Sequence, residues 1–197
     1  MNKRKIQISR KTSETNIQLE LNLDGSGESK INTGIPFFDH MLILFAKHSL
    51  FDLIIKAEGD IQVDFHHTVE DVGISLGNAF RESLRDCYGI NRYASGLYPM
   101  DESLTQIAVD ISGRPFLSFK PDNIKGKTGD FDCELIKEFL LAFVNNAKIT
   151  LHIDVLNGDN LHHILESCFK GLGIVLDQAT KIDDRKKSVP STKGVLI

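Results

Sequence analysis

A pair of adjacent histidines followed by a glutamate occurs twice in this 197-residue chain, 96 residues apart. The first copy is His66-His67-Thr68-Val69-Glu70, and the second is His162-His163-Ile164-Leu165-Glu166. A Leu-Gly pair follows each copy in the same register, at positions 76–77 and 172–173. The chain is therefore expected to be an internal duplication, with halves of about 1–93 and 94–197 related by a pseudo-twofold axis.

The apolar patterns within each half predict strands that alternate with helices. Strands are expected at 15–23, 51–57, 104–111, 116–119 and 149–156, and helices at 37–45, 66–87, 134–145 and 162–180. An extra loop at 120–130 distinguishes the second half, and the tail at 183–197 is expected to be irregular. Because each half is too small to cover its own sheet, we expect a single α+β domain over 1–197, an internally duplicated sheet-plus-helices unit.

The composition excludes several classes of protein. No apolar run approaches the ~20 residues of a membrane span, so no membrane partner is expected. The formal net charge of -4 and the absence of Trp argue against a nucleic-acid partner. Three widely spaced cysteines form no disulfide framework, so a cytoplasmic, reducing compartment is expected.

The histidines predict metal binding. Adjacent residues on a helix point about 100° apart, so each pair is expected to serve two different metal ions. Imidazole and carboxylate are standard ligands of divalent transition metals, although this set suits zinc or iron at least as well as manganese. Two sites of three histidines and one glutamate are expected, within one chain or between subunits. The candidate ligands are His40, His66, His67, Glu70, His152, His162, His163 and Glu166.

Other polar residues have weaker signals. Arg92, Arg114 and the Pro190-Ser191-Thr192-Lys193-Gly194 segment could together bind a phosphate, although each cation alone is more often a solvated surface charge. His48 could line the same cleft as His40 or lie on the surface. Glu14 and Asp101-Glu102 are expected to be exposed turn residues unless the metals lie nearby.

Taken together, these motifs resemble the imidazoleglycerol-phosphate dehydratase family of histidine biosynthesis. The resemblance runs nearly the full length, through SRKTSETNI, DGSG, TGIPFFDHML, GDIQVDFHHTVEDVGISLG, GINRY, PMDESL, VDISGRPF, TLHIDVLNGDNLHHILESCFK and PSTKG. Ala94 and Ser103 depart from the usual Gly and Ala, and neither is a candidate ligand. No phosphatase domain is attached, which suggests the monofunctional form.

This resemblance implies a fold of the ribosomal protein S5 domain 2-like type and a homo-oligomer of 24 subunits. It implies two Mn²⁺ ions per active site, built between subunits and bound by the eight candidate ligands. It further implies that Arg92, Arg114, Ser191 and Lys193 bind the substrate phosphate. Glu14 would be the catalytic acid/base, and His48 would line the substrate pocket.

The implied reaction converts D-erythro-imidazole glycerol phosphate to imidazole acetol phosphate. Metal binding to both ring nitrogens would favour the imidazolate, which can expel the adjacent hydroxyl and give a diazafulvene-like intermediate. The neighbouring C–H then becomes acidic enough for Glu14 to remove its proton. Two alternatives from the residues alone are a dinuclear hydrolase and a metal-storage or sensing protein.

Overall fold

Each half of the chain builds one four-stranded sheet and two helices in the order β-β-β-α-β-α, in a computed structural model that describes residues 4–122 and 124–196. The first half contains β1 (Lys5–Lys11), β2 (Thr15–Asn22), β3 (Ser29–Asn32), α1 (Pro36–Ser49), β4 (Asp52–Gly59) and α2 (His66–Leu84). The second contains β5 (Tyr93–Met100), β6 (Ser103–Asp110), β7 (Phe116–Lys120), α3 (Leu135–Ala147), β10 (Thr150–Asn157) and α4 (Leu161–Thr180). The expected duplication of an α+β unit is confirmed.

The two sheets have the same topology. Their strand orders are β1-β2-β4-β3 and β5-β6-β10-β7. In each sheet the third strand of the half pairs in parallel with the fourth, and the other neighbours are antiparallel. The register of the central pair places Ile17 opposite Ala57 in the first sheet and Ile107 opposite Ile153 in the second.

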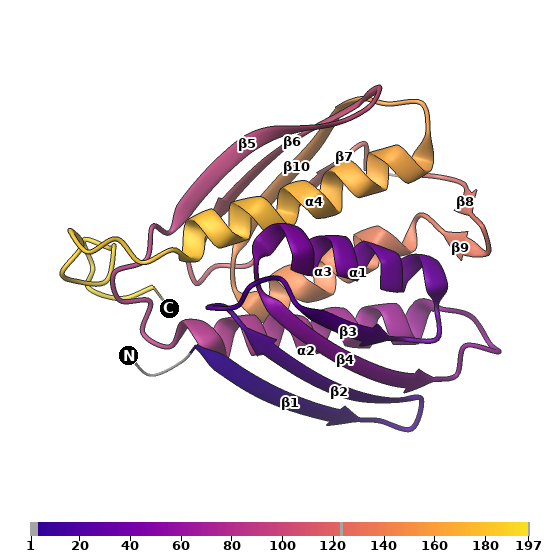
Figure 1. Ribbon diagram of the computed structural model, residues 1–197, viewed down its shortest axis with the longest axis horizontal. Coiled ribbons are helices and arrows are strands. Elements are labelled where there is room, and N and C mark those ends of the chain that lie inside the picture. The colour runs from indigo at the N-terminus through magenta and orange to yellow at the C-terminus, as the bar shows by residue number, and fades with distance from the viewer. Residues whose placement is uncertain (1–3, 123, 197) are drawn as a thin grey trace.

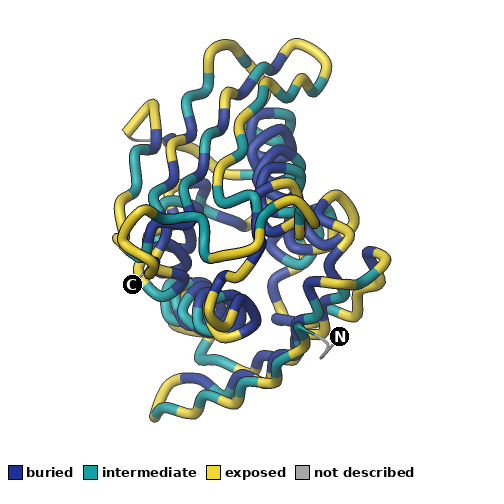
Figure 2. The backbone as a smooth tube through the Cα atoms, turned by 90° about the vertical axis from the view of Figure 1, so that its left-hand side faces the viewer, coloured by how far each residue is buried: buried dark blue, intermediate teal, exposed yellow. Residues whose placement is uncertain are grey.

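The four helices lie between the two sheets (Figure 1). In β2 and β6 every second side chain points toward the helices. The buried side chains on these faces include Ile17, Leu19, Ile107 and Val109. Helices pair across the repeat, α1 with α4 and α2 with α3, so one continuous hydrophobic core joins the two halves. Figure 2 shows this buried interior and the exposed turns around it.

A glycine at each interhelical contact allows the helices to approach closely. A Cβ atom on Gly173 of α4 would lie 2.7 Å from the carbonyl oxygen of Phe45 in α1. A Cβ atom on Gly77 of α2 would lie 2.6 Å from the carbonyl oxygen of Phe143 in α3. The repeated Leu-Gly pair of the sequence therefore marks two equivalent close contacts between helix backbones.

The sequence patterns missed three strands and one hairpin. β1 and β5 are edge strands of their sheets. Pro99 and Gly96 are tolerated in β5 because it is an edge strand, but they weaken its alternation of apolar and polar residues. β3 has only four residues, of which Ile31 alone is apolar. The extra loop of the second half contains a short hairpin, β8 (Lys127–Thr128) paired with β9 (Phe131–Asp132), which two-residue strands cannot signal by alternation. The tail has no helix or strand through Leu196, and Ile197 lies outside the described residues.

The direction of the helices gives the molecule two chemically different ends. All four helices begin at the right-hand end in Figure 1, where the β1–β2 and β5–β6 turns also lie. The C-terminal tail and the start of β5 lie at the opposite end (Figure 1). Among the helices within 4–122 and 124–196, none is long and apolar enough to cross a membrane.

Candidate active site

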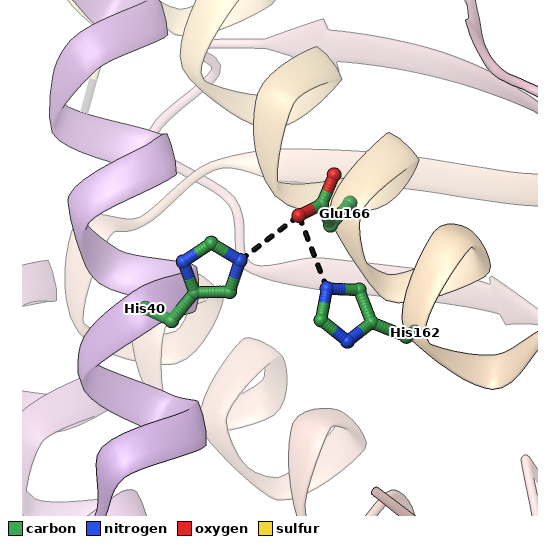
Figure 3. Close-up of side chains that lie close together, drawn as sticks. All are labelled: His40, His162 and Glu166. Atoms are coloured by element: carbon green, nitrogen blue, oxygen red, sulfur yellow. Dashed lines mark hydrogen bonds and ion pairs between the residues drawn. The ribbon is translucent and has the colours of Figure 1, made fainter.

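Three of the predicted metal ligands meet between α1 and α4. His40 comes from the second turn of α1, and His162 and Glu166 come from the start of α4 (Figure 3). The Nε2 atoms of His40 and His162 lie 2.9 and 3.2 Å from Oε1 of Glu166. One ligand atom from each residue lies within 4.8 Å of the others, so this donor set fits a divalent metal ion.

The groups around Glu166 lower the pKa of its carboxyl group. Burial raises the pKa of the Glu166 carboxyl, but bonds from Lys170, His40 and His162 outweigh burial and lower the pKa to about 2. Lys170 lies one turn further along α4, with Nζ 2.6 Å from Oε2 of Glu166. The carboxylate is therefore ionised at neutral pH, as a metal ligand must be.

His163 faces away from this cluster. The His162 and His163 rings are 6.3 Å apart and nearly perpendicular, at 83°, as expected for adjacent residues on a helix. Asn160 begins α4 by accepting a hydrogen bond from the His162 backbone N–H at 2.9 Å. The Nδ1 atom of His163 lies 2.7 Å from Oε2 of Glu102, and this bond lowers the pKa of the Glu102 carboxyl to about 2.

The first half presents a related arrangement at the start of α2. The His66 and His67 rings are 6.1 Å apart at 86°. The Nδ1 atom of His67 lies 3.0 Å from Oδ2 of Asp60 and 3.9 Å from Oε2 of Glu14. Glu14, the predicted acid/base, lies in the β1–β2 turn with its side chain 52% exposed. Glu70 is half-buried on the next turn of α2.

His66, His152 and His48 are not members of the His40 cluster, although the charges of Glu166 and Lys170 act on His48. His66 lines a cleft with Asp122, which follows β7, and with residues at the start of α3 that include Glu138. His152 is exposed on the outer face of β10, with its ring 5.5 Å from that of Phe116. His48 is exposed near the end of α1, and packing around its ring, followed by the charge of Lys170, lowers its pKa.

The predicted phosphate ligands lie together in a second cleft, separate from the His40 cluster. Arg114, Ser191 and Lys193 line an open cleft of about 860 Å³ that also includes Arg92. Arg92 donates to Asp110 Oδ1 at 2.7 Å and to the carbonyl oxygen of Pro190 at 2.8 Å, so it holds the tail against β6. The side chain of Arg114 is 71% exposed, and Lys193 is also exposed. These cations give the cleft the chemistry of an anion site.

The phosphate cleft and the His40 cluster lie at opposite ends of the molecule. The backbone N–H of Arg92 donates to the carbonyl oxygen of Ala179, near the end of α4, at 2.8 Å. Ala179 lies 17 residues after His162 in the same helix, a distance of about 25 Å at a rise of 1.5 Å per residue. A small substrate cannot contact both places within one chain.

Several residues that contact the predicted ligands are not recognisable from the motifs alone. Asp60 and Asp110 were not among the predicted site residues, nor was Lys170, although its position four residues after Glu166 places both on one face of α4. Glu102 was expected to be an exposed turn residue unless metal ligands lay nearby, and His163 does lie beside it. The available signal was the internal repeat, which places Glu102 in the position of Glu14.

Comparison with known proteins gives one consistent result. The family model described as imidazoleglycerol-phosphate dehydratase matches residues 33–176. The chain is 59% identical to the imidazoleglycerol-phosphate dehydratase of Pelobacter propionicus, over 96% of this chain and 97% of that protein. It is 56% identical to that of Trichlorobacter lovleyi, over 98% and 100%.

Solved structures agree with the sequence relatives. The crystal structure of imidazoleglycerol-phosphate dehydratase from Staphylococcus aureus has a TM-score of 0.82 at 41% identity, covering 91% of this chain and 99% of that one. The enzyme from Pyrococcus furiosus, solved in complex with (S)-C348, has a TM-score of 0.82 at 40% identity, covering 96% and 100%.

Proposed function

The chain belongs to the imidazoleglycerol-phosphate dehydratase family, and from that premise we propose how its two ends cooperate in one active site. The chain is a lyase of histidine biosynthesis that acts on a phosphorylated imidazole substrate. We propose that it removes water from D-erythro-imidazole glycerol phosphate to give imidazole acetol phosphate.

The observation that carries the proposed metal dependence is the convergence of His40, His162 and Glu166 on one point. We assign these three residues to one Mn²⁺ ion, and His66, His67, Glu70, His152 and His163 to the remaining positions of two metal sites. When bound, two Mn²⁺ ions would favour loss of the imidazole N–H proton and departure of the neighbouring hydroxyl through a diazafulvene-like intermediate. Two ions match the two nitrogens of the substrate ring.

The remaining chemistry belongs to side chains of the protein. The ring-adjacent carbon loses its hydroxyl, and Glu14 as general base removes the proton from the next carbon of the chain, because its carboxylate is exposed and lies near His67. Arg114, Ser191 and Lys193 bind the phosphate, with Arg92 fixing the tail from which two of them come. His48 lines the substrate pocket beside Lys170.

The distance between the two ends supports an active site shared between subunits. Since the phosphate cleft lies at the far end of α4 from His162, a second copy must bring its own cleft to the metal end. His152, exposed on the outer face of β10, is available to such a neighbour. We propose a closed assembly of 24 subunits as the form that completes every site. The three buried free cysteines support a reducing, cytoplasmic compartment.

The direct test is turnover of imidazole glycerol phosphate by assembled protein, followed by the absorbance of the enolised product. We expect activity with Mn²⁺, loss of activity after chelation, and recovery on adding Mn²⁺. We expect imidazole glycerol without phosphate to be a much poorer substrate. Absence of turnover by assembled, metal-loaded protein would reject the proposed reaction.

A further inference from the structure

We propose that Asp60 is a positioning residue that orients His67 and thereby leaves Glu14 free for proton transfer. The inference rests on the proposed function for the role of Glu14, and on the internal repeat for the comparison between halves. Glu14 and Glu102 occupy equivalent turns between the first two strands of their sheets, and His67 and His163 occupy equivalent positions in α2 and α4. The two pairs nevertheless differ in which carboxylate meets the histidine.

In the second half, both carboxylate oxygens of Glu102 have hydrogen-bond partners. Its Oε2 atom lies 2.7 Å from His163 Nδ1, and its Oε1 atom accepts from the backbone N–H of Asn160 at 3.0 Å. A weaker contact to the backbone N–H of Asp159 is 3.4 Å long. A carboxylate held on both oxygens orients a histidine well, but it is not free to take a proton from a substrate.

In the first half, Asp60 replaces the glutamate at the histidine. Oδ2 of Asp60 lies 3.0 Å from His67 Nδ1, whereas Oε2 of Glu14 lies 3.9 Å away, beyond hydrogen-bond distance. The side chain of Asp60 is only 21% exposed, against 52% for Glu14. The less exposed carboxylate, that of Asp60, therefore orients the ring, and the more exposed one, that of Glu14, remains accessible.

Asp60 also contacts Glu14 directly through the backbone. Its N–H donates to the carbonyl oxygen of Glu14 at 3.2 Å, and its own carbonyl accepts from the N–H of Val63 at 2.8 Å. From the other side of the turn, Thr12 Oγ1 accepts from the N–H of Glu14 at 3.1 Å. One residue thus fixes the backbone of the catalytic turn and the ring of His67.

The consequence for metal binding concerns the ring nitrogens. A histidine that donates Nδ1–H to a carboxylate presents Nε2, with its lone pair, to a metal, and the carboxylate makes that nitrogen more basic. Asp60 and Glu102 would therefore orient His67 and His163 in the same way. Loss of such a partner commonly weakens metal binding by 10- to 100-fold.

The test combines Asp60→Asn, Asp60→Ala, Glu14→Gln and the double variant Asp60→Ala/Glu14→Gln. Mn²⁺ affinity of the assembled protein is measured from free Mn²⁺ by electron paramagnetic resonance, beside kcat and KM. Glu58→Gln is the matched control, since this exposed carboxylate lies two residues before Asp60 and bonds to Lys56. The thermal midpoint of each variant reports folding.

We expect Asp60→Asn to weaken Mn²⁺ affinity about tenfold with an unchanged midpoint, and Glu58→Gln to change nothing. Glu14→Gln alone should leave affinity unchanged. In the Asp60→Ala background Glu14 can move onto His67, so adding Glu14→Gln there should weaken affinity further. Wild-type affinity in both Asp60 variants, or strictly additive effects in the double variant, would overturn the inference. Affinity does not require turnover, so failure of the proposed reaction would be seen separately.

Discussion

The carboxylates of the candidate site differ in how many hydrogen bonds and ion pairs they make within the chain. Glu166 binds two histidines and Lys170, and Glu102 binds His163 and a helix N-terminus. Both have their pKa lowered to about 2. Glu14 instead extends into solvent next to His67. The roles that we propose for these carboxylates, as ligand, orienting group and base, rest on these differences in environment.

Glu14→Gln tests the role of the base. The amide keeps the size of the side chain but cannot accept a proton, so kcat should fall by about a thousandfold. Metal content, measured by elemental analysis, should stay at the wild-type value because Glu14 is not a predicted ligand. Near-normal turnover by the variant would remove Glu14 from the mechanism.

Asp52, which lies outside the candidate active site, leads to a prediction of how the stability of the protein depends on pH. Its Oδ1 accepts from the N–H of Ser26 at 2.8 Å and of Glu28 at 3.2 Å, and Asn22 donates to Oδ2. These bonds, led by that from Ser26, lower the pKa of the Asp52 carboxyl. A carboxyl group whose pKa is lower in the folded state than in the unfolded state stabilises the folded protein. This stabilisation is complete at pH values above the unfolded-state pKa, and it is lost as the pH falls through the folded-state pKa.

Asp52→Asn should therefore cost about 1 kcal/mol of stability near neutral pH. The difference from wild type should shrink as pH falls below about 4. Thermal unfolding midpoints across pH measure both effects. A difference that stays constant down to pH 2 would show that the charge of Asp52 is not the cause.

The sequence predicted eight candidate metal ligands, and the structure brings His40, His162 and Glu166 within 4.8 Å of one another. The doubled histidine motif contains six of the eight candidates, and the other two, His40 and His152, lie on α1 and β10. The motif could not identify Asp60, whose contact with His67 depends on how α2 lies against the turn after β4. Lys170, by contrast, lies four residues after Glu166 on α4, and that spacing alone indicates that the two side chains share one helix face.

At the scale of elements, close helix packing holds the ligands together. His40 lies on α1 and Glu166 on α4, so their 2.9 Å contact depends on the distance between these helices. Gly173 sets that distance seven residues beyond Glu166, since it leaves room for the backbone of α1. Helices and central strands were predictable from periodicity, whereas the edge strands β1, β3 and β5 depend on pairing partners rather than on their own pattern.

Gly173→Ala tests this packing. Alanine at an exposed helix position would stabilise by about 1 kcal/mol relative to glycine. Here its Cβ atom would lie 2.7 Å from the carbonyl oxygen of Phe45 and 2.9 Å from the N atom of Ser49, so the helices must separate. We expect a loss of about 1–3 kcal/mol, measured by thermal unfolding.

The exposed Gln178, also on α4, supplies the control. Gln178→Ala should leave the unfolding midpoint nearly unchanged. Gly77→Ala should destabilise about as much as Gly173→Ala, because the same contact recurs between α2 and α3. A stabilising effect of alanine at either glycine would show that the helices adjust without cost.

At the scale of the whole molecule, the duplication places all helix starts at one end and the phosphate cleft at the other. This arrangement gives one chain both components of the site without bringing them together. The sequence predicted both groups of residues, but not their separation, because the direction of α4 relative to the tail is a property of the folded chain. The proposed assembly follows from that separation.

The central claim is that the metal end of one copy works with the phosphate cleft of another, and complementation in mixed assemblies tests it most directly. His162→Ala and Arg114→Ala should each be nearly inactive as homogeneous assemblies. Their 1:1 mixture, reassembled with Mn²⁺, should recover up to about one quarter of wild-type activity, because random mixing pairs intact ends in that share of sites. A mixture of His162→Ala with His40→Ala, damaged at the same end, should recover nothing. If the first mixture also stays inactive while assembling normally, the site is not shared between copies.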